Sequence, residues 1–407
     1  MKDSESYTKQ TLVHVRYLSE IIGGRGSCTP QERRASEYIA NQLNILGVQT
    51  VHTQPFKAIP STYLPFALSF SIALVGSLFS LFFGSRYTTV LAAFLNALGF
   101  WGMLAETEFA SSWVRWFLPK TMTQNVIGVV PPTNIIQKRV VLDAHLDTHR
   151  TPIFYSSRKW HTLFSTLVGM TLLSMALGAI AFGISALFDW HWMRWLSLIL
   201  VPVQVFALTL CLHADFTPFT PGANDNASGV GVILGLAERL IDHPLDHTEV
   251  NLVFTGCEEA GANGIQAYLN THATELGEET VYIVLDEVGN GSIKYLTEDG
   301  LVLKHKTHPR ALELAQAASS ACPEIRVFKG AGIAYTDALP ATKRNLIALT
   351  LCTLPPPGSG RESHWHQMSD TFEHVIPRDL TSTHQLTWQI LKLIDSTAGE
   401  RTSPISE

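Results

Sequence analysis

The segment Arg139-Val-Val-Leu-Asp-Ala-His-Leu-Asp-Thr148 joins an apolar run to two polar side chains that can bind a metal. Its short apolar half predicts a buried strand from Val140 to Ala144. His145 and Asp147 follow at once, and their spacing of two places both side chains on the same side where the strand ends. A histidine and a carboxylate arranged in this way can hold a metal ion and orient its ligand. Later segments of the chain must then supply the remaining ligands.

Strands and helices alternate around this stretch. The expected strands cover residues 48–56, 125–130, 251–255, 281–285 and 346–351. The expected helices cover residues 10–22, 30–46, 230–241, 309–320 and 380–394, and a further helix begins at 264. This alternation predicts an α/β fold, with a mostly parallel mixed sheet and flanking helices. Open sheets of this class place their sites at the carboxyl ends of strands.

The composition sets limits on where the protein resides. Of its 407 residues, 46% are hydrophobic and only 16% are charged, whereas about 25% charged residues are usual in soluble domains. Part of the chain should therefore lie in lipid or in a very large core. The net charge of −6 gives no basic footprint for a nucleic acid. The five cysteines lack CxxC spacing, and the polar N-terminus lacks an apolar signal segment, so we expect free thiols in a reducing compartment.

Four long uncharged runs account for the apolar composition. They cover residues 64–84, 87–105, 161–188 and 195–212. Each is about long enough to span a hydrocarbon core of roughly 30 Å as a helix. The alternative is a pair of buried helical hairpins in a soluble core, but soluble helices of this length normally carry a charged face. Seven of the nine tryptophans lie in or beside these runs, as in interfacial aromatic belts.

The runs divide the chain into a catalytic domain and two inserted transmembrane hairpins. The predicted catalytic domain comprises residues 1–56, 121–150 and 216–407, and the hairpins comprise 57–120 and 151–215. Basic residues near the runs gather on the side shared with the catalytic domain: Lys57, Arg115, Lys120, Arg150, Arg158 and Lys159. The two short turns hold only Arg86 and Arg194. The positive-inside rule therefore predicts a multi-pass membrane protein with its catalytic domain in the cytoplasm.

Ionisable side chains follow the expected strands at their carboxyl ends. They are His145, Asp147, Glu258, Glu259 and Asp286, joined by Asp225 in a loop before a helix and by His366 late in the chain. Taken singly, such residues are more often structural histidines, helix caps or surface acids. Together they would bring many buried carboxylates to one sheet edge, where a cation normally offsets their repulsion. Imidazole and carboxylate ligands suit zinc, and manganese or cobalt would also fit.

The motifs that hold these residues resemble those of the co-catalytic di-zinc exopeptidases, typified by bacterial leucyl aminopeptidase, glutamate carboxypeptidase and their glutaminyl cyclase relatives. The matching segments are Ala-His145-Leu-Asp147, Pro-Gly-Ala-Asn-Asp225-Asn-Ala-Ser-Gly, Phe-Thr-Gly-Cys-Glu258-Glu259-Ala-Gly, Leu-Asp286-Glu-Val-Gly and His366-Gln-Met-Ser-Asp370-Thr. Thr336-Asp337 also resembles a late Ser/Thr-Asp segment of the family. The resemblance covers residues 10–56 and 121–395, apart from the second hairpin.

The resemblance implies a role for each of these residues. Two zinc ions would be bound, with Asp225 bridging them. His145 and Asp286 would complete one site, and Glu259 and His366 would complete the other. Asp147 would hold the His145 ring through its second nitrogen. Glu258 would be the general base toward a metal-activated water and then the acid toward the leaving amine.

The chain departs from the family in the length of one connection. Between Asp147 and Asp225 lie 77 residues, including one hairpin, where relatives have a short loop. The active site should therefore lie at or near the cytoplasmic lipid surface. His149 and His213, which flank this hairpin, are expected on the surface or behind the ligands, and His364 is expected in the pocket or behind the ligands.

Four functions follow as hypotheses. The first is a zinc aminopeptidase that cleaves peptide bonds. The second is an amidase for lipid-linked or acylated amides, which the inserted hairpin favours. The third is a glutaminyl cyclase, which as the resemblance implies would use one zinc instead of two. The fourth is a non-catalytic receptor or transporter part, which would require lost ligands. The expected partners are a peptide or amide substrate and the lipid bilayer, and the sequence gives no oligomeric state.

Overall fold

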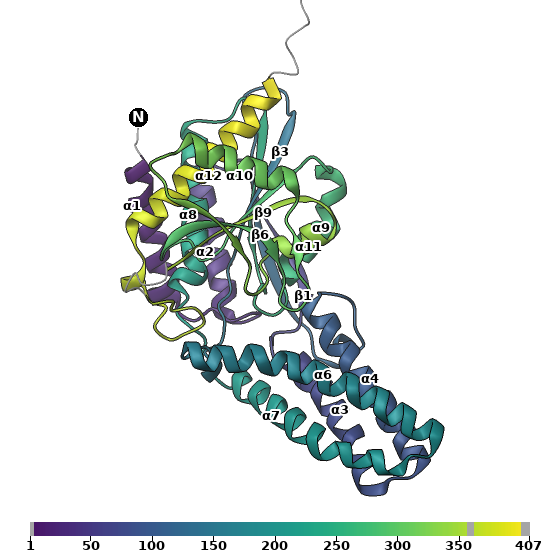
Figure 1. Cartoon of the computed structure of the whole chain (residues 1–407). Coiled ribbons are helices and arrows are strands. Elements are labelled where there is room, and N and C mark those ends of the chain that lie inside the picture. Colours follow the sequence, from purple (N-terminus) through teal and green to yellow (C-terminus); the bar gives the residue numbers. More distant parts are fainter. Residues whose placement is uncertain (1–3, 356–361, 400–407) are drawn as a thin grey trace, which may run out of the picture. The chain divides into compact units, whose positions relative to one another are not determined.

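The structure, a computed structural model, describes residues 4–355 and 362–399. Contacts within the chain define two compact units. The first comprises Met1–Pro60, Thr121–His149 and Phe219–Glu407, and the second comprises Ser61–Lys120 and Arg150–Pro218. Figure 1 shows the first unit as a sheet with helices around it and the second as a bundle of long helices.

A mixed sheet forms the centre of the first unit. Its strands are β1 (Thr50–Ala58), β2 (Thr121–Val130), β3 (Lys138–His145), β4 (Thr248–Thr255), β5 (Val281–Leu285), β6 (Ser292–Asp299), β7 (His305–Lys306), β8 (Val327–Ala331) and β9 (Ile347–Leu354). They follow the order β1-β2-β4-β3-β5-β9-β6-β7, and β8 pairs with β6. The central strands β4, β3, β5 and β9 run parallel, whereas β1, β2, β6 and β7 pair antiparallel along this path. The predicted α/β class with a mixed sheet is confirmed, although β6, β7 and β8 were not predicted.

Helices cover the sheet on both faces. They are α1 (Ser4–Arg16), α2 (Pro30–Leu46), α8 (Gly229–Asp242), α9 (Asn263–Leu276), α10 (Pro309–Ala321), α11 (Ala338–Lys343) and α12 (Pro377–Gly399). One large apolar core joins α1, α2, α8, α10 and α12 to alternate strand residues such as Val140, Leu142 and Ala144. Residues between them, such as Val141, point to the other face because strand side chains alternate, and Figure 1 shows α9 and α11 on that side.

The helix expected at residues 30–46 has the predicted ends. The Thr29 hydroxyl accepts a hydrogen bond from the Glu32 amide at 3.3 Å, and Pro30 occupies the first helical position. Gly47 ends the helix with φ of 83°, a conformation that glycine adopts without a Cβ clash. The first expected helix instead starts earlier, at Ser4, and continues after Arg16 as a wider π-helical turn over Tyr17–Ile22.

The register of the sheet positions the site. His145, the last residue of β3, lies beside Thr255, the last residue of β4. On the other side of β3, Asp143 lies beside Val284 of β5, just before Asp286. Parallel strands end at the same sheet edge, so the segments that follow β3, β4 and β5 converge there.

The second unit contains four helices that are long and apolar enough to cross a membrane: Leu64–Phe83, Arg86–Thr107, Arg158–Phe188 and His191–Asp215. The first three are α3, α4 and α6, and the fourth includes α7 (Ser197–Asp215) after a short 3₁₀ turn; α5 (Val114–Phe117) is a single turn. All four predicted apolar runs are therefore helical.

A polar cluster holds these helices together in the middle of the bundle. The Asn96 amide donates to the Ala92 carbonyl at 2.9 Å, and Gln204 of α7 donates to the Asn96 Oδ1 at 3.0 Å. Both side chains are fully buried. A Cβ added to Gly178 of α6 would lie 2.6 Å from the Asn96 Oδ1, so a side chain at this position would displace the Asn96 amide. Gln204 is thus a partner on another helix for Asn96, a strongly polar side chain within the uncharged run 87–105.

Candidate metal centre

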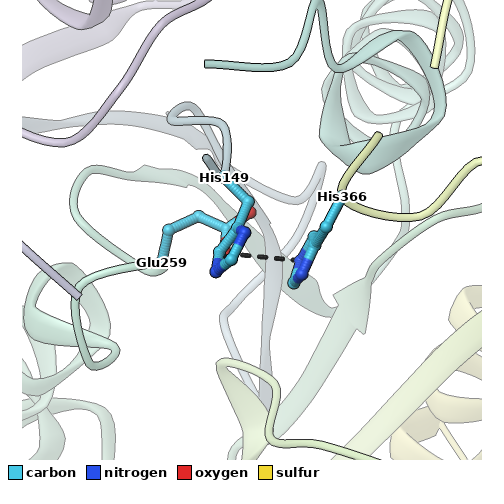
Figure 2. A group of neighbouring side chains, drawn as sticks. All are labelled: His149, Glu259 and His366. Atoms are coloured by element: carbon cyan, nitrogen blue, oxygen red, sulfur yellow. Dashed lines mark ion pairs between the residues drawn. The ribbon is translucent and has the colours of Figure 1, made fainter. Parts of the chain in front are cut away.

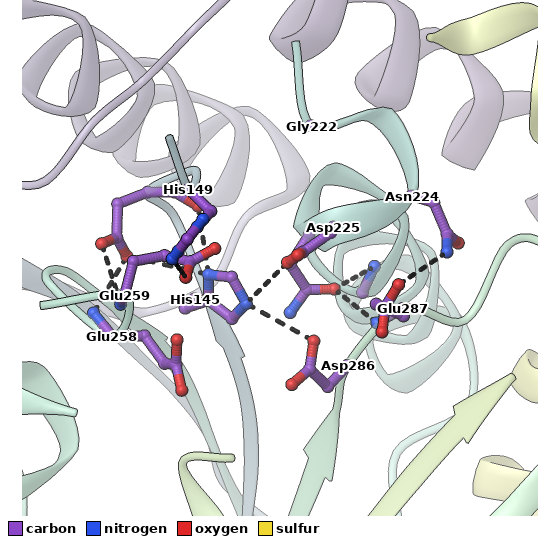
Figure 3. A network of polar contacts seen from close by, with 12 residues as sticks. His145, His149, Gly222, Asn224, Asp225, Glu258, Glu259, Asp286 and Glu287 are labelled. Atoms are coloured by element: carbon purple, nitrogen blue, oxygen red, sulfur yellow. Dashed lines mark hydrogen bonds and ion pairs between the residues drawn. The ribbon is translucent and has the colours of Figure 1, made fainter. Parts of the chain in front are cut away.

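His145 is the centre of the first group of possible ligands. Its Nε2 lies 3.3 Å from Asp225 Oδ1 and 3.4 Å from Asp286 Oδ1. The three side chains come from the end of β3, the loop before α8 and the segment after β5. Figure 3 shows the contacts from the His145 ring to both aspartates, which lie on the same side of the ring.

His366 forms a second group on the other side of Asp225. Its Nε2 lies 3.2 Å from Asp225 Oδ2 and 3.6 Å from Glu259 Oε2. The two oxygens of Asp225 therefore face two different imidazoles. A carboxylate placed in this way can contact a ligand on each side.

The separations fit the chemistry of a zinc-like ion. Zinc binds nitrogen and carboxylate oxygen at about 2.0–2.2 Å in tetrahedral sites, which places neighbouring ligand atoms about 3.4 Å apart. In both groups the histidine nitrogen lies 3.2 to 3.6 Å from the carboxylate oxygens. The buried histidine and carboxylate groups thus fit a metal site, as the sequence predicted.

Burial makes the cluster costly without a cation. Asp225 is 2% exposed, Glu258 is 4% and Glu259 is 5%. Burial raises the pKa of Glu258 well above its usual value, and the nearby acids Asp337 and Asp286 add to this while His145 opposes it. Buried carboxylic acids close to one another resist losing their protons. A positive ion beside them stabilises their charged form.

Asp147 positions the two glutamates. Its Oδ1 accepts the Glu258 amide at 3.0 Å, and its Oδ2 accepts the Glu259 amide at 3.1 Å and the Ser27 hydroxyl at 2.5 Å. The His145 Nδ1 lies 3.1 Å from the main-chain carbonyl of Asp147 and 3.7 Å from its carboxylate. Asp147 thus orients the ring mainly through its backbone, while its carboxylate fixes the turn that carries Glu258 and Glu259.

The loop that carries Asp225 is held by the segment that carries His366. Asp370 accepts the Asn224 amide at 2.8 Å and the Asp225 amide at 3.0 Å. Burial raises the pKa of Asp370 to about 7, although these two hydrogen bonds by themselves lower it. Gly222 adopts φ of 60°, and a Cβ there would lie 2.3 Å from the Thr148 methyl group. These contacts fix Asp225 between the two histidines.

Arg25 was not identified from the sequence, yet it ties the two ligand loops together. Its guanidinium donates to the Leu146 carbonyl at 3.0 Å, to the Pro221 carbonyl at 2.8 Å and to the Gly222 carbonyl at 2.9 Å. It is 1% exposed. The sequence feature that could have identified Arg25 is its place within Gly23-Gly-Arg-Gly26. Glycines let the backbone pack closely around a large side chain.

Glu32 is a second positioning residue that the sequence reading missed. Its carboxylate accepts the Cys257 and Cys28 amides, each at 2.8 Å, and the Thr123 hydroxyl at 2.5 Å. Burial raises the pKa of Glu32 to about 8, and the charge of Asp147 contributes. In the sequence Glu32 looked like an ordinary acid in the first turn of α2.

The three other histidines that the sequence singled out lie in different surroundings. His364 Nδ1 lies 2.8 Å from the Ser369 hydroxyl, its ring stacks on His374, and His213 is exposed near the end of α7. His149, in contrast, is 3% exposed and not on the surface. It lies with Glu259 and His366 in a group whose ligand atoms are all within 4.8 Å of one another.

Residues 204–391, a little under half of the chain, match the sequence profile described as Peptidase family M28. The predicted family resemblance is confirmed. Aminopeptidase YwaD of Bacillus subtilis is 28% identical over 189 residues, which cover 43% of this chain and 38% of that protein. The chain therefore spans less than two fifths of that curated relative. Both matches are to peptidases.

Solved structures share the fold. BSAP, a zinc aminopeptidase from Bacillus subtilis, has a TM-score of 0.56 and 15% identity, covering 95% of this chain and 94% of its own. A Bacteroides thetaiotaomicron glutaminyl cyclase has a TM-score of 0.54 and 16% identity, covering 94% and 96%. At these identities the similarity establishes the fold alone.

Proposed function

We propose that the chain is a membrane-integrated zinc metallopeptidase that acts as an aminopeptidase on peptide or amide substrates. One observation carries the proposal: Asp225 presents each of its two oxygens to a different buried imidazole, 3.3 Å and 3.2 Å away. Such a set would hold two ions, with His145 and Asp286 at one position and Glu259 and His366 at the other. Zinc is the preferred ion, and manganese or cobalt also suit these ligands.

Bound ions would supply Lewis acidity and lower the pKa of the attacking water. The protein supplies the proton transfers through Glu258. Its amide is fixed on Asp147, and its Oε1 has no hydrogen-bond partner among the described residues. Glu258 can therefore take the proton of the attacking water and pass it to the leaving amine. Its neighbour Glu259 faces His366 instead, so the two glutamates divide the roles of base and ligand.

The substrate class is tested with three types of compound and purified protein in detergent. Hydrolysis of leucyl-arylamide with a free amine, abolished by a chelator and restored by zinc, is the expected result. Hydrolysis confined to N-acylated or lipid-linked amides in micelles would instead favour the amidase, which the hairpin inserted between Asp147 and Asp225 suggests. Cyclisation of N-terminal glutamine without hydrolysis would favour a cyclase and would contradict the aminopeptidase.

The second unit would anchor the enzyme in the bilayer. Four helices of sufficient length and apolarity support this, and the basic residues beside them favour a cytoplasmic catalytic unit. We expect a cysteine-reactive, membrane-impermeant label added to intact cells to modify Ser85→Cys in the turn between α3 and α4. The same label should not modify Glu324→Cys, an exposed position in the first unit, until the cells are opened. The reverse pattern would contradict this topology.

A further inference from the structure

We infer that His149 is an additional ligand of the second metal position, which then has four protein ligands: Asp225, Glu259, His366 and His149. The inference rests on the proposed function, because it needs a metal at that position. Figure 2 shows His149 beside His366 and close to Glu259.

The distances place His149 among the other donors. Its Nε2 lies 3.9 Å from Glu259 Oε2, the same oxygen that lies 3.6 Å from the His366 Nε2. One nitrogen or oxygen of each of the three residues lies within 4.8 Å of the others. All three side chains are at most 8% exposed. A single small cation at this point can therefore be reached by both imidazoles and the carboxylate.

The backbone keeps His149 in place. Its carbonyl accepts the Thr220 amide at 2.9 Å. The preceding residue, Thr148, donates its amide to the Arg25 carbonyl at 3.2 Å and accepts the Arg25 amide on its hydroxyl at 2.9 Å. The segment that presents His145 and His149 is thus fixed from both sides. Its position does not depend on a flexible surface loop.

One adjustment is needed for ligation. The rings of His149 and His366 stack with their centroids 3.5 Å apart and their planes 11° from parallel. Imidazole nitrogens bind metals along the lone pair in the ring plane, and two parallel planes do not meet at one ion. One ring must therefore tilt when the ion binds. Ring stacking is weak compared with a metal–imidazole bond, so the tilt is favourable.

The extra ligand would make the two positions unequal. The first has three protein ligands, His145, Asp225 and Asp286. The second would have four, which fills the tetrahedral set that closed zinc sites use, whereas catalytic sites keep an open position. The first position would then be the one open to water and substrate. The second would hold its ion more tightly and exchange it more slowly.

The test measures metal binding and compares variants of the 407-residue chain in detergent. His149→Phe keeps an aromatic ring against His366 but removes both nitrogens, so it separates ligation from stacking. His149→Cys restores a zinc ligand of another kind. His14→Gln is the matched control, because His14 is a buried histidine of the same unit that contacts Tyr38 on α2.

Zinc content is measured after equilibration with a competing chelator, and the absorption of the cobalt-substituted protein reports the coordination number. We expect two ions in wild type and in the control, and a second ion bound about 10- to 100-fold more weakly or worse in His149→Phe. His149→Cys should recover most of this affinity. The cobalt bands of wild type should be the intense ones of four-coordinate cobalt, and they should weaken in His149→Phe.

The outcomes separate this inference from the proposed function. If His149→Phe binds two zinc ions as tightly as wild type does, His149 is not a ligand, and the proposed metallopeptidase function still stands. A wild-type protein that binds no zinc would overturn both. If His149→Phe does not fold, unchanged cobalt bands and zinc affinity in His149→Gln would equally overturn the inference.

Discussion

Glu258→Gln is expected to lower hydrolysis of leucyl-arylamide by about 10²–10⁴-fold, the usual contribution of a general base. Glutamine has nearly the same shape as glutamate, so the hydrogen bond from the main-chain amide of residue 258 to the Asp147 carboxylate, at 3.0 Å, should persist. It cannot accept the proton of the attacking water. The loss should therefore appear in kcat and not in the affinity for substrate.

The adjacent glutamate gives the matched control for this prediction. Glu259→Gln should lose metal from the second position, because Glu259 faces His366 at 3.6 Å. Glu258→Gln should keep its full zinc content. Full activity of Glu258→Gln with normal metal content would show that another group is the base.

Asp225→Asn is expected to weaken the binding of both metal ions, by more than about 100-fold each. Losing even a hydrogen-bond partner of a metal ligand lowers metal affinity by about 10- to 100-fold, and losing the ligand itself should cost more. Asp225 faces both His145 and His366. Asparagine has one oxygen and no charge, so it can complete neither position fully. Activity should fall to background, and added zinc should restore it only in part.

A change of charge away from the site controls for this variant. Glu324→Gln removes one exposed carboxylate in the first unit and should leave zinc content and activity unchanged. If Asp225→Asn kept one ion with wild-type affinity, Asp225 would be a ligand of one position alone. The bridging role would then be wrong.

The strand-end motifs could be predicted because their chemistry is local in sequence. His145 and Asp147 follow an apolar strand directly, and Asp286 follows another. The rule that parallel strands end at one edge then brings them together without knowledge of side-chain packing. The same reasoning could not place β6 and β8. They pair with each other beside the parallel centre, where β6 alternates only over its first four residues and β8 is short and largely exposed.

The supporting residues could not be predicted because their contacts are long-range. Arg25 meets carbonyls more than a hundred positions away, at Leu146 and Pro221. Glu32 meets the Cys257 amide from the first turn of α2. Each looks like an ordinary charged residue until the fold buries it. His149 was expected on the surface or behind the ligands because it begins the connection to an apolar run, and only the packed loop shows it beside His366.

The central claim is that one buried centre holds two zinc ions that hydrolysis requires. The most direct measurement is the zinc content of the detergent-purified chain, followed through chelation and zinc addition together with leucyl-arylamide hydrolysis. We expect two zinc ions per chain, with activity lost as they are removed and regained as they return. A chain that hydrolyses the substrate at full rate with no bound metal would contradict it.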